Sequence, residues 1–318
     1  MKTLRERFEN PAREYRSMPF WGWNDELDPK EMASQIESMK SHGMGGFFMH
    51  SREGLETAYM GPEWMECVKI CVQKAKEEGL SAWLYDEDRW PSGTAGGQVT
   101  AESEDFRAKG LTLEISQRSF YPEPSVQAVF KARIDGMNLL ECERLRITET
   151  YPALCEEVYL IFRMETAAPS AWFNNESPPD NLNPATVQCF IQKTHEKYKS
   201  AVGQEFGKTI PGIFTDEPGL HDRNCHFTDY RGWLPWTRGF AEYFSEKRGY
   251  DILDTVPHIF FHGAFSSKAR HDYWRTITER FSEAFTRQLY TWCERNGLSS
   301  TGHFLWEGNL GVATRVCG

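Results

Sequence analysis

The chain has 318 residues, of which 40 % are hydrophobic and 26 % are charged, the composition of a globular protein with a sizeable core. Its formal net charge is −10 and no basic block stands out, so nucleic acid is not an expected partner. The sequence contains no run of about eighteen apolar residues, so we expect no membrane-spanning helix.

The amino terminus and the cysteines favour a cytoplasmic location. Residues 1–11 carry charges, and no apolar stretch follows them as it would in a secretory signal. The eight cysteines are scattered without a CxxC pair, which favours reduced thiols. Cys67 and Cys71 lie four residues apart in a helical pattern, and we expect them to face the core rather than to bind a metal.

Short apolar segments and amphipathic helical patterns alternate in the first part of the chain. Proline at the first helical position and glycine after the last one delimit the helices. The predicted strands are 18–24, 45–50 and 80–85, and the predicted helices are 28–43 and 62–78. Strands that alternate with helices form parallel sheets, and apolar runs without strict alternation indicate a sheet covered on both sides.

The pattern changes in the middle of the chain. Residues 111–173 alternate between apolar and polar side chains, as antiparallel strands with one exposed face do, and residues 174–183 are rich in proline and asparagine. We therefore divide the chain into a first barrel part (1–110), an inserted β module with its linker (111–183) and a continuation of the barrel (184–318).

The continuation contains two further predicted strands, each preceded by a helical pattern. Its predicted elements are a helix over 184–202, a strand over 210–215, a loop-like stretch over 219–235, helices over 236–248 and 268–296, and a strand over 299–306.

These elements predict an α/β fold of the (β/α)8 TIM-barrel type that is incomplete, with about five βα units and an inserted antiparallel β module. The alternative is a sheet that does not close into a barrel. We favour a piece of a longer barrel protein, in which two strand edges would be left unpaired.

Polar residues follow each predicted strand at the point where its apolar run ends. In a barrel these positions form one rim, which is where active sites lie. The residues are Asn24, His50, Asp86 with Glu87 and Asp88, Asp216 with Glu217, and Glu307 shortly after His303.

Two of these carboxylates suit the hydrolysis of a glycosidic bond. One carboxyl group must protonate the leaving oxygen, while the other must be ionised to activate water or to attack the sugar. We expect Glu217 to be the general acid and Glu307 to be the base or nucleophile. The alternatives are that Glu217 caps a turn and that Glu307 is an exposed residue after the last strand.

The other strand-end residues are expected to bind substrate. Asp86, Glu87 and Asp88 could hold a divalent cation or sugar hydroxyls, or form a solvated acidic turn. His50 and Arg52 could orient a hydroxyl, and Trp90 could stack on a sugar ring. We also assign Asn24, Asp216 and His303 to substrate binding, and we assign no residue to a metal. The Gly-rich segment 93–97 matches no nucleotide motif, and we expect a flexible rim loop there.

Five segments resemble the barrel motifs of bacterial glycoside hydrolases related to family 106, the α-L-rhamnosidases. They are FWGWNDELDP, GMGGFFMHSREGLETAYMGPEW, WLYDEDRWPSGTAGG, GIFTDEPG and TGHFLWEGNL. The resemblance implies an inverting hydrolase that acts on terminal α-linked L-rhamnose, with calcium holding sugar hydroxyls and no organic cofactor. By motif position it points to Glu217 and Glu307 as the catalytic acids.

The chain departs from that family in two respects: its members are much longer and have further barrel strands, and many of them carry the secretion signal that we do not expect here. Two other functions therefore stay open. One is a non-catalytic, carbohydrate-binding barrel fragment. The other is a metal-dependent hydrolase, which usually needs several histidines at strand ends, where this sequence offers only His50 and His303.

Overall fold

The computed structural model describes residues 3–220, 232–305 and 307–311, which divide into two compact units. Within these residues, the first unit takes in the chain up to Val99, Val187–Gly219 and Thr286–Leu305. The second unit takes in the remaining described residues. Because the first unit is built on a parallel sheet and the second on an antiparallel one, we call them the parallel-sheet unit and the antiparallel-sheet unit.

The parallel-sheet unit contains five strands in the order β1-β2-β3-β8-β10, and every neighbouring pair is parallel. The strands are β1 (Phe20–Trp23), β2 (Gly46–Ser51), β3 (Ser81–Tyr85), β8 (Gly212–Thr215) and β10 (Ser299–Gly302). This agrees with the five predicted strands. Among the described residues, β1 and β10 are the sheet edges, so the sheet is compatible with a partial barrel but is not closed.

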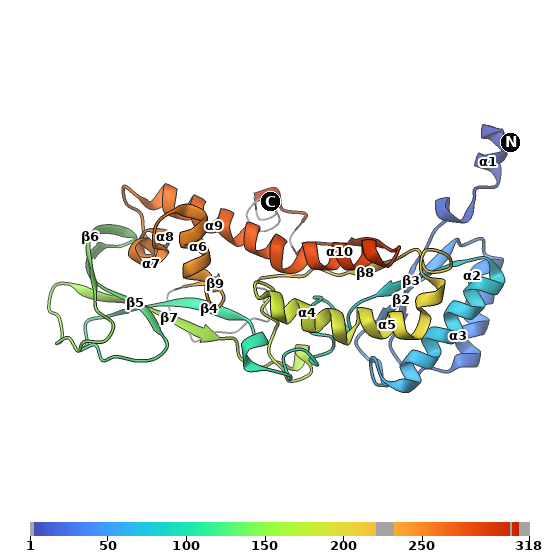
Figure 1. Cartoon of the computed structure of the whole chain (residues 1–318), viewed down its shortest axis with the longest axis horizontal. Coiled ribbons are helices and arrows are strands. Elements are labelled where there is room, and N and C mark those ends of the chain that lie inside the picture. Colours follow the sequence, from blue (N-terminus) through green and yellow to red (C-terminus); the bar gives the residue numbers. More distant parts are fainter. Residues whose placement is uncertain (1–2, 221–231, 306, 312–318) are drawn as a thin grey trace. The chain divides into compact units, whose positions relative to one another are not determined.

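Helices connect these strands and pack on one face of the sheet (Figure 1). They are α2 (Pro29–Ser41), α3 (Pro62–Glu78), α5 (His195–Val202) and α10 (Arg287–Arg295). Asp28 caps α2 by accepting from the backbone N–H of Lys30, and Gly79 ends α3 in the left-handed conformation that glycine adopts without strain. These signals in the sequence are why the first two helices begin and end where we predicted them.

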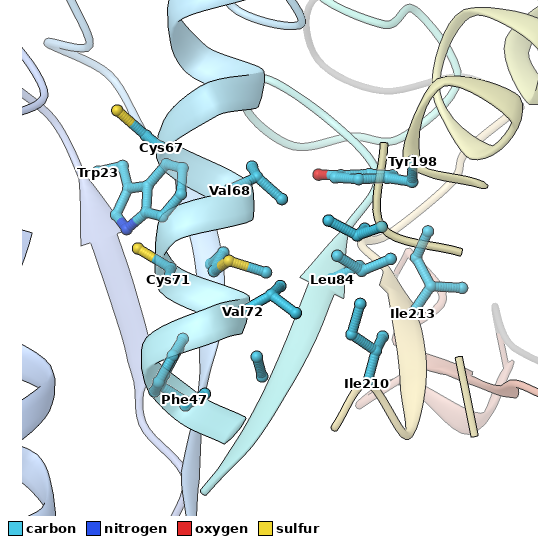
Figure 2. Close-up of a cluster of buried hydrophobic side chains, with 14 of the residues drawn as sticks. Trp23, Phe47, Cys67, Val68, Cys71, Val72, Leu84, Tyr198, Ile210 and Ile213 are labelled. Carbon is cyan, nitrogen blue, oxygen red and sulfur yellow. The ribbon is translucent and has the colours of Figure 1, made fainter. Parts of the chain in front are cut away.

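The core of the parallel-sheet unit lies between the sheet and these helices. Figure 2 shows Val68, Cys71 and Val72 of α3 facing the sheet, where Leu84 and Ile213 pack in the same buried cluster. Cys67 and Cys71 are both buried, which confirms that they face the core.

The opposite face of the parallel sheet carries a row of aromatic rings, because side chains alternate between the two faces along each strand. The ring centroids of Phe20 and Phe48 are 4.9 Å apart, and those of Phe48 and Trp83 are 5.2 Å apart. Phe214 continues the row with its centroid 4.9 Å from that of Phe20. Phe20 is 48 % exposed, so this face is partly open.

The antiparallel-sheet unit contains five strands in the order β6-β5-β7-β4-β9. They are β4 (Lys109–Ser116), β5 (Val126–Asp135), β6 (Asn138–Leu145), β7 (Val158–Thr166) and β9 (Trp233–Trp236). The sequence predicted β4, β5 and β7 but missed β6, whose side chains are mostly exposed and whose alternation is therefore weak. It also missed β9, where Pro235 interrupts a short apolar run and argues against a strand.

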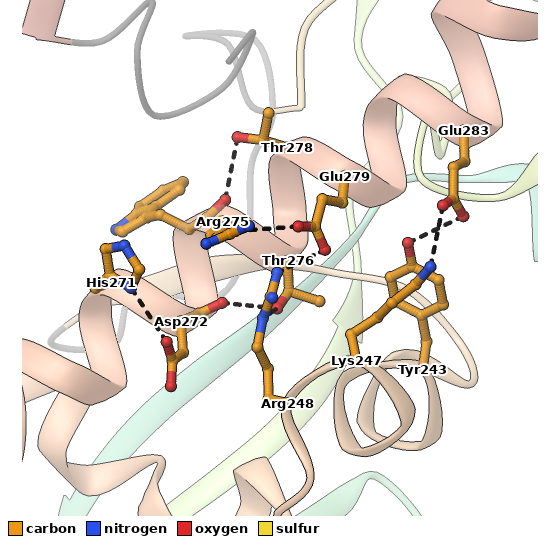
Figure 3. Close-up of polar contacts among 11 residues, drawn as sticks. Tyr243, Lys247, Arg248, His271, Asp272, Arg275, Thr276, Thr278, Glu279 and Glu283 are labelled. Atoms are coloured by element: carbon orange, nitrogen blue, oxygen red, sulfur yellow. Dashed lines mark hydrogen bonds and ion pairs between the residues drawn. The ribbon is translucent and has the colours of Figure 1, made fainter.

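Four helices accompany this sheet: α6 (Phe240–Arg248), α7 (Ile252–Thr255), α8 (Pro257–Phe260) and α9 (Ser266–Phe281). Polar contacts join α6 to the end of the long helical segment (Figure 3). Arg248 Nη2 lies 2.5 Å from Glu279 Oε2, while Glu283 accepts from the hydroxyl of Tyr243 at 3.0 Å. The pairing fixes the packing of α6, whose Phe240 and Phe244 are buried.

Several predicted elements are subdivided. The helix expected over 184–202 is two helices, α4 (Pro184–Lys193) and α5, and the one expected over 268–296 passes from α9 through a π-helical turn, Ser282–Thr286, into α10. The expected barrel continuation, 184–318, contributes to both units, because β9 pairs with β4. The short elements are α1 (Leu4–Glu9) and the 3-10 turns Arg13–Tyr15, Glu104–Phe106, Ala171–Phe173 and Gly203–Glu205.

Candidate active site

The carboxyl ends of β2, β3 and β8 bring three polar side chains together. Tyr85, the last residue of β3, donates its hydroxyl to Asp216 Oδ2 at 2.8 Å. His50 of β2 places Nε2 3.8 Å from the same oxygen, and its ring meets that of Tyr85 edge-on with centroids 4.0 Å apart. We call His50, Tyr85 and Asp216 the strand-end triad.

The strand-end triad is mostly buried and has unused hydrogen-bonding capacity. His50 Nε2 is shielded from solvent and has no hydrogen-bond partner among the residues that the structure describes, because 3.8 Å is too long for a hydrogen bond to Asp216. The side chain of Asp216 is 15 % exposed. A buried polar atom without a partner is costly, so this position suits a bound polar group that bridges the histidine and the carboxylate.

Asp86 directly follows Tyr85 of the triad, and both of its carboxylate oxygens accept hydrogen bonds from side-chain hydroxyls. Its Oδ1 accepts from Ser92 Oγ and its Oδ2 from Thr215 Oγ1, both at 2.6 Å. Ser92 also joins the end of β8, since its N–H donates to the carbonyl of Asp216 at 2.7 Å and its hydroxyl accepts from the Asp216 N–H at 2.8 Å. Burial raises the pKa of Asp86 to about 8, against the effect of the two hydroxyl donors, which lower it.

Glu87 is fully buried and accepts five backbone N–H groups. Four of the donors belong to residues 93–96, the segment that we expected to be a flexible rim loop. The segment is instead folded around a carboxylate, because the side chain supplies the acceptors that its inward-pointing amides need. Burial raises the pKa of Glu87 to about 7, while the donated N–H groups lower it.

Glu217 leaves the strand in an unusual backbone conformation. Its φ is +45°, in the left-handed region that residues other than glycine rarely adopt. Residues with this conformation are concentrated at functional sites. Its N–H donates to the carbonyl of His303 at 3.1 Å, and the N–H of His303 donates to Thr215 at 3.1 Å. The side chain of Glu217 is partly exposed, and that of His303 is exposed.

The remaining predicted site residues lie outside the triad. Asn24 is exposed and lines, with Trp21 and residues 25–28, a depression of about 210 Å³. Asp88 is buried, with Oδ2 3.5 Å from Arg89 Nε. Arg52 and Trp90 are partly buried, and Glu307 is exposed and belongs to the antiparallel-sheet unit. The pairing of Glu217 with Glu307 therefore stays a prediction.

Glu87 does not fit a calcium site. Calcium needs several oxygen atoms with free lone pairs, and the two oxygens of Glu87 already accept five backbone N–H groups. Asp86 accepts one hydroxyl on each oxygen, which leaves a lone pair on both. In the part of the chain that the structure describes, no three His, Cys, Asp or Glu residues form a group that could hold a metal ion. The calcium expectation is thus supported by the sequence resemblance alone.

Three residues of this region were missed from the sequence. Tyr85 looked like the end of an apolar strand, and Ser92 and Thr215 carry no motif of their own. A usable signal for Tyr85 was present, because it directly precedes Asp86 as Thr215 precedes Asp216 on the neighbouring strand. Residues that end adjacent parallel strands meet at one edge of the sheet.

No family model matches this sequence, and no curated protein matches it. Its structure is similar to that of the rhamnosidase from Novosphingobium sp. PP1Y, with a TM-score of 0.59 and 12 % sequence identity. The similarity covers 96 % of this chain and 47 % of that chain, so this chain spans about half the length of that enzyme. Within the described residues, no helix combines the length and the apolar character that crossing a membrane requires. The chain has a rhamnosidase-like fold.

Proposed function

We propose that this chain carries the active site of a glycoside hydrolase that cleaves a terminal α-L-rhamnoside. The observation that carries the proposal is the strand-end triad, with Glu217 directly after Asp216. Active sites of parallel α/β folds lie at the carboxyl ends of the strands, and the triad lies there. The rhamnosidase-like fold and the motif resemblance support the choice of sugar.

In this proposal Glu217 protonates the glycosidic oxygen as the bond breaks. Its partly exposed side chain can reach a bound substrate, and the left-handed backbone turns it out of the strand direction. Asp216 and His50 bind a sugar hydroxyl between them: the carboxylate accepts from the hydroxyl, and the imidazole Nε2–H donates to the hydroxyl oxygen. Tyr85 holds Asp216 in place through its own hydroxyl.

Inversion needs a second carboxylate on the opposite side of the sugar ring, about 6.5–9.5 Å from the first, so that a water molecule fits between them. We propose Glu307 for this role on the basis of its motif position. We further propose that Asn24, Arg52, Asp88, Trp90 and His303 contact more distant parts of a glycoside or oligosaccharide.

The six described cysteines are free, which supports a cytosolic location.

Hydrolysis of 4-nitrophenyl α-L-rhamnopyranoside tests the proposal. Glu217→Gln should lower kcat/KM by about 10²–10⁴-fold, the usual contribution of a general acid. The loss should be smaller with a 2,4-dinitrophenyl glycoside, because that leaving group needs little protonation. Glu63→Gln, an exposed change of the same type on α3, is the matched control. An unchanged rate in Glu217→Gln would remove Glu217 from the mechanism.

A second candidate function is carbohydrate binding without catalysis. The partly open aromatic face formed by Phe20, Phe48 and Trp83 favours it, because sugar rings stack on exposed aromatic side chains. Calorimetry with L-rhamnose separates the two functions. Binding that is lost in Trp83→Ala, together with no hydrolysis of any aryl glycoside, would support this second function.

A further inference from the structure

The carboxylate of Glu87 forms the centre of a compact backbone structure. Its Oε1 accepts from the N–H groups of Asp88 and Gly96, at 2.9 and 2.6 Å. Its Oε2 accepts from those of Gly93, Thr94 and Ala95, at 3.0, 2.8 and 2.9 Å. Both oxygens are saturated, so Glu87 has no acceptor left for a sugar hydroxyl.

The segment around Glu87 has a backbone that needs such an anchor. Gly93, Ala95, Gly96 and Gly97 have φ values of +134°, +51°, +64° and +88°. Ala95 is strained in this region, because the left-handed conformation brings its Cβ close to the following carbonyl oxygen. Successive amides in such conformations point inward and form a concave site for an anion. Here the anion is a side chain of the same segment, and the amides are fixed by it.

The amide cradle of Glu87 adjoins the residue that joins the two strand ends. Ser92 directly precedes Gly93, and it makes one hydrogen bond to Asp86 and two to the backbone of Asp216. Displacement of residues 93–96 would therefore move Ser92, and with it the backbone from which Asp216 and Glu217 project. Glu87, which is buried, can therefore influence the positions of Asp216 and Glu217, the residues that we propose contact the sugar.

We propose that Glu87 is a positioning residue of the glycosidase site, which acts through Ser92 on Asp216 and Glu217. The proposal builds on the proposed function. Its mechanism is structural: the five amide contacts fix the loop, the loop fixes Ser92, and Ser92 fixes the end of β8. Glu87→Gln keeps the shape of the side chain but replaces an acceptor oxygen with an NH₂ group, which cannot accept from the amides that now face it.

Hydrogen–deuterium exchange of the amides at pH 8 tests the structural half without any substrate. In the wild type, the amides of residues 93–96 and of Asp216 should exchange slowly. Glu87→Gln should accelerate exchange at both places, whereas Ser92→Ala should accelerate it at Asp216 only. Glu63→Gln should change neither. Unchanged exchange at Asp216 in Glu87→Gln would overturn the proposal, even if the enzyme were inactive.

A double-mutant cycle on the hydrolysis of 4-nitrophenyl α-L-rhamnopyranoside tests the functional half. Small misplacements of reacting groups cost roughly 100-fold in rate, so each of Glu87→Gln and Ser92→Ala should lower kcat by up to about that factor with little change in KM. The double variant should lose no more than the worse single variant, because both changes act through the same contact.

Two results of the cycle are decisive. Multiplied losses in the double variant would overturn the route through Ser92. A wild type that hydrolyses no rhamnoside would overturn the proposed function, while the exchange experiment would still decide whether Glu87 fixes the end of β8. Should Glu87→Gln not fold, Glu87→Asp, which keeps the charge but withdraws it by one methylene group, replaces it with the same expectations.

Discussion

Two neighbouring strands of the parallel sheet, β3 and β8, are each followed by the dipeptide Asp-Glu, and the two dipeptides have opposite surroundings. Asp86 and Glu87 after β3 are fully buried, and hydroxyl and amide donors occupy all four of their oxygens. Asp216 and Glu217 after β8 are partly exposed, and His50 Nε2, which has no hydrogen-bond partner within the described ranges, lies 3.8 Å from Asp216 Oδ2. The comparison shows that acidic residues after a strand can either stabilise the fold or remain accessible to a substrate. The difference depends on whether the following loop supplies hydrogen-bond donors to them.

The largest expected difference in stability is between substitutions of Glu87 and of Glu217. Glu87→Ala removes the acceptor of five N–H groups, four of which belong to buried residues, and unsatisfied buried groups cost about 1–3 kcal/mol each before the structure relaxes. We expect a loss of at least about 3 kcal/mol in the free energy of unfolding. Glu217→Ala should have little effect. Urea denaturation followed by tryptophan fluorescence measures both, and equal losses would contradict the comparison.

A glycine on the edge strand should show the next largest effect. A Cβ at Gly302 would lie 1.9 Å from the carbonyl oxygen of Thr215, so Gly302→Ala must push β10 away from β8. Strain of this kind costs about 1–3 kcal/mol, and it should also weaken the contact between Glu217 N–H and His303. Gly203→Ala, which would meet only the flexible side chain of Lys199, is the control. Thermal unfolding of both variants decides the matter; a Gly302→Ala variant as stable as the wild type would rule out the close strand pairing.

The pH dependence of the free energy of unfolding tests the burial of Asp86. The pKa of Asp86 is raised to about 8, whereas the pKa of an unfolded aspartate is about 3.9. Between these values the folded state binds a proton that the unfolded state releases, so the contribution of Asp86 to stability falls as the pH rises. Relative to Asp86→Asn, the wild type should lose up to about 1.4 kcal/mol per pH unit in this window. Parallel curves of unfolding free energy against pH would show that Asp86 titrates normally.

The smallest effect concerns the hydroxyl of Tyr85. Tyr85→Phe removes the hydrogen bond to Asp216 and should cost about 1 kcal/mol in the free energy of unfolding. Tyr198→Phe removes a comparable bond, from the Tyr198 hydroxyl to the carbonyl of Tyr85, and should cost about as much. Only Tyr85→Phe should also lower the hydrolysis rate. Equal rates in the two variants would argue that Tyr85 does not orient Asp216 for substrate.

The parallel-sheet unit was largely predictable from the sequence because its signals are local. Proline, glycine and a capping aspartate mark the ends of α2 and α3, and apolar runs mark the strands. The antiparallel-sheet unit was less predictable. Its strand β9 joins β4 from more than a hundred residues away, and no local pattern announces such a pairing.

The candidate site was predictable in outline but not in its division of roles. Strand-end position put His50 and Asp216 at one rim together with the other strand-end residues, and their side chains lie 3.8 Å apart. It also placed Glu87 beside the substrate, although the structure gives that side chain five backbone partners. The reason is that the cradle consists of backbone amides in left-handed conformations. Residue types along the segment 93–97 suggest a glycine-rich loop but not the direction in which its N–H groups point.

The most direct test of the account compares Glu217→Gln and Glu87→Gln in hydrolysis and in thermal stability. The account predicts that Glu217→Gln lowers kcat/KM for 4-nitrophenyl α-L-rhamnopyranoside by about 10²–10⁴-fold at an unchanged melting temperature. It predicts that Glu87→Gln lowers the melting temperature and impairs turnover only in part. A Glu217→Gln variant that hydrolyses the glycoside at the wild-type rate would contradict the assignment of chemistry to the end of β8.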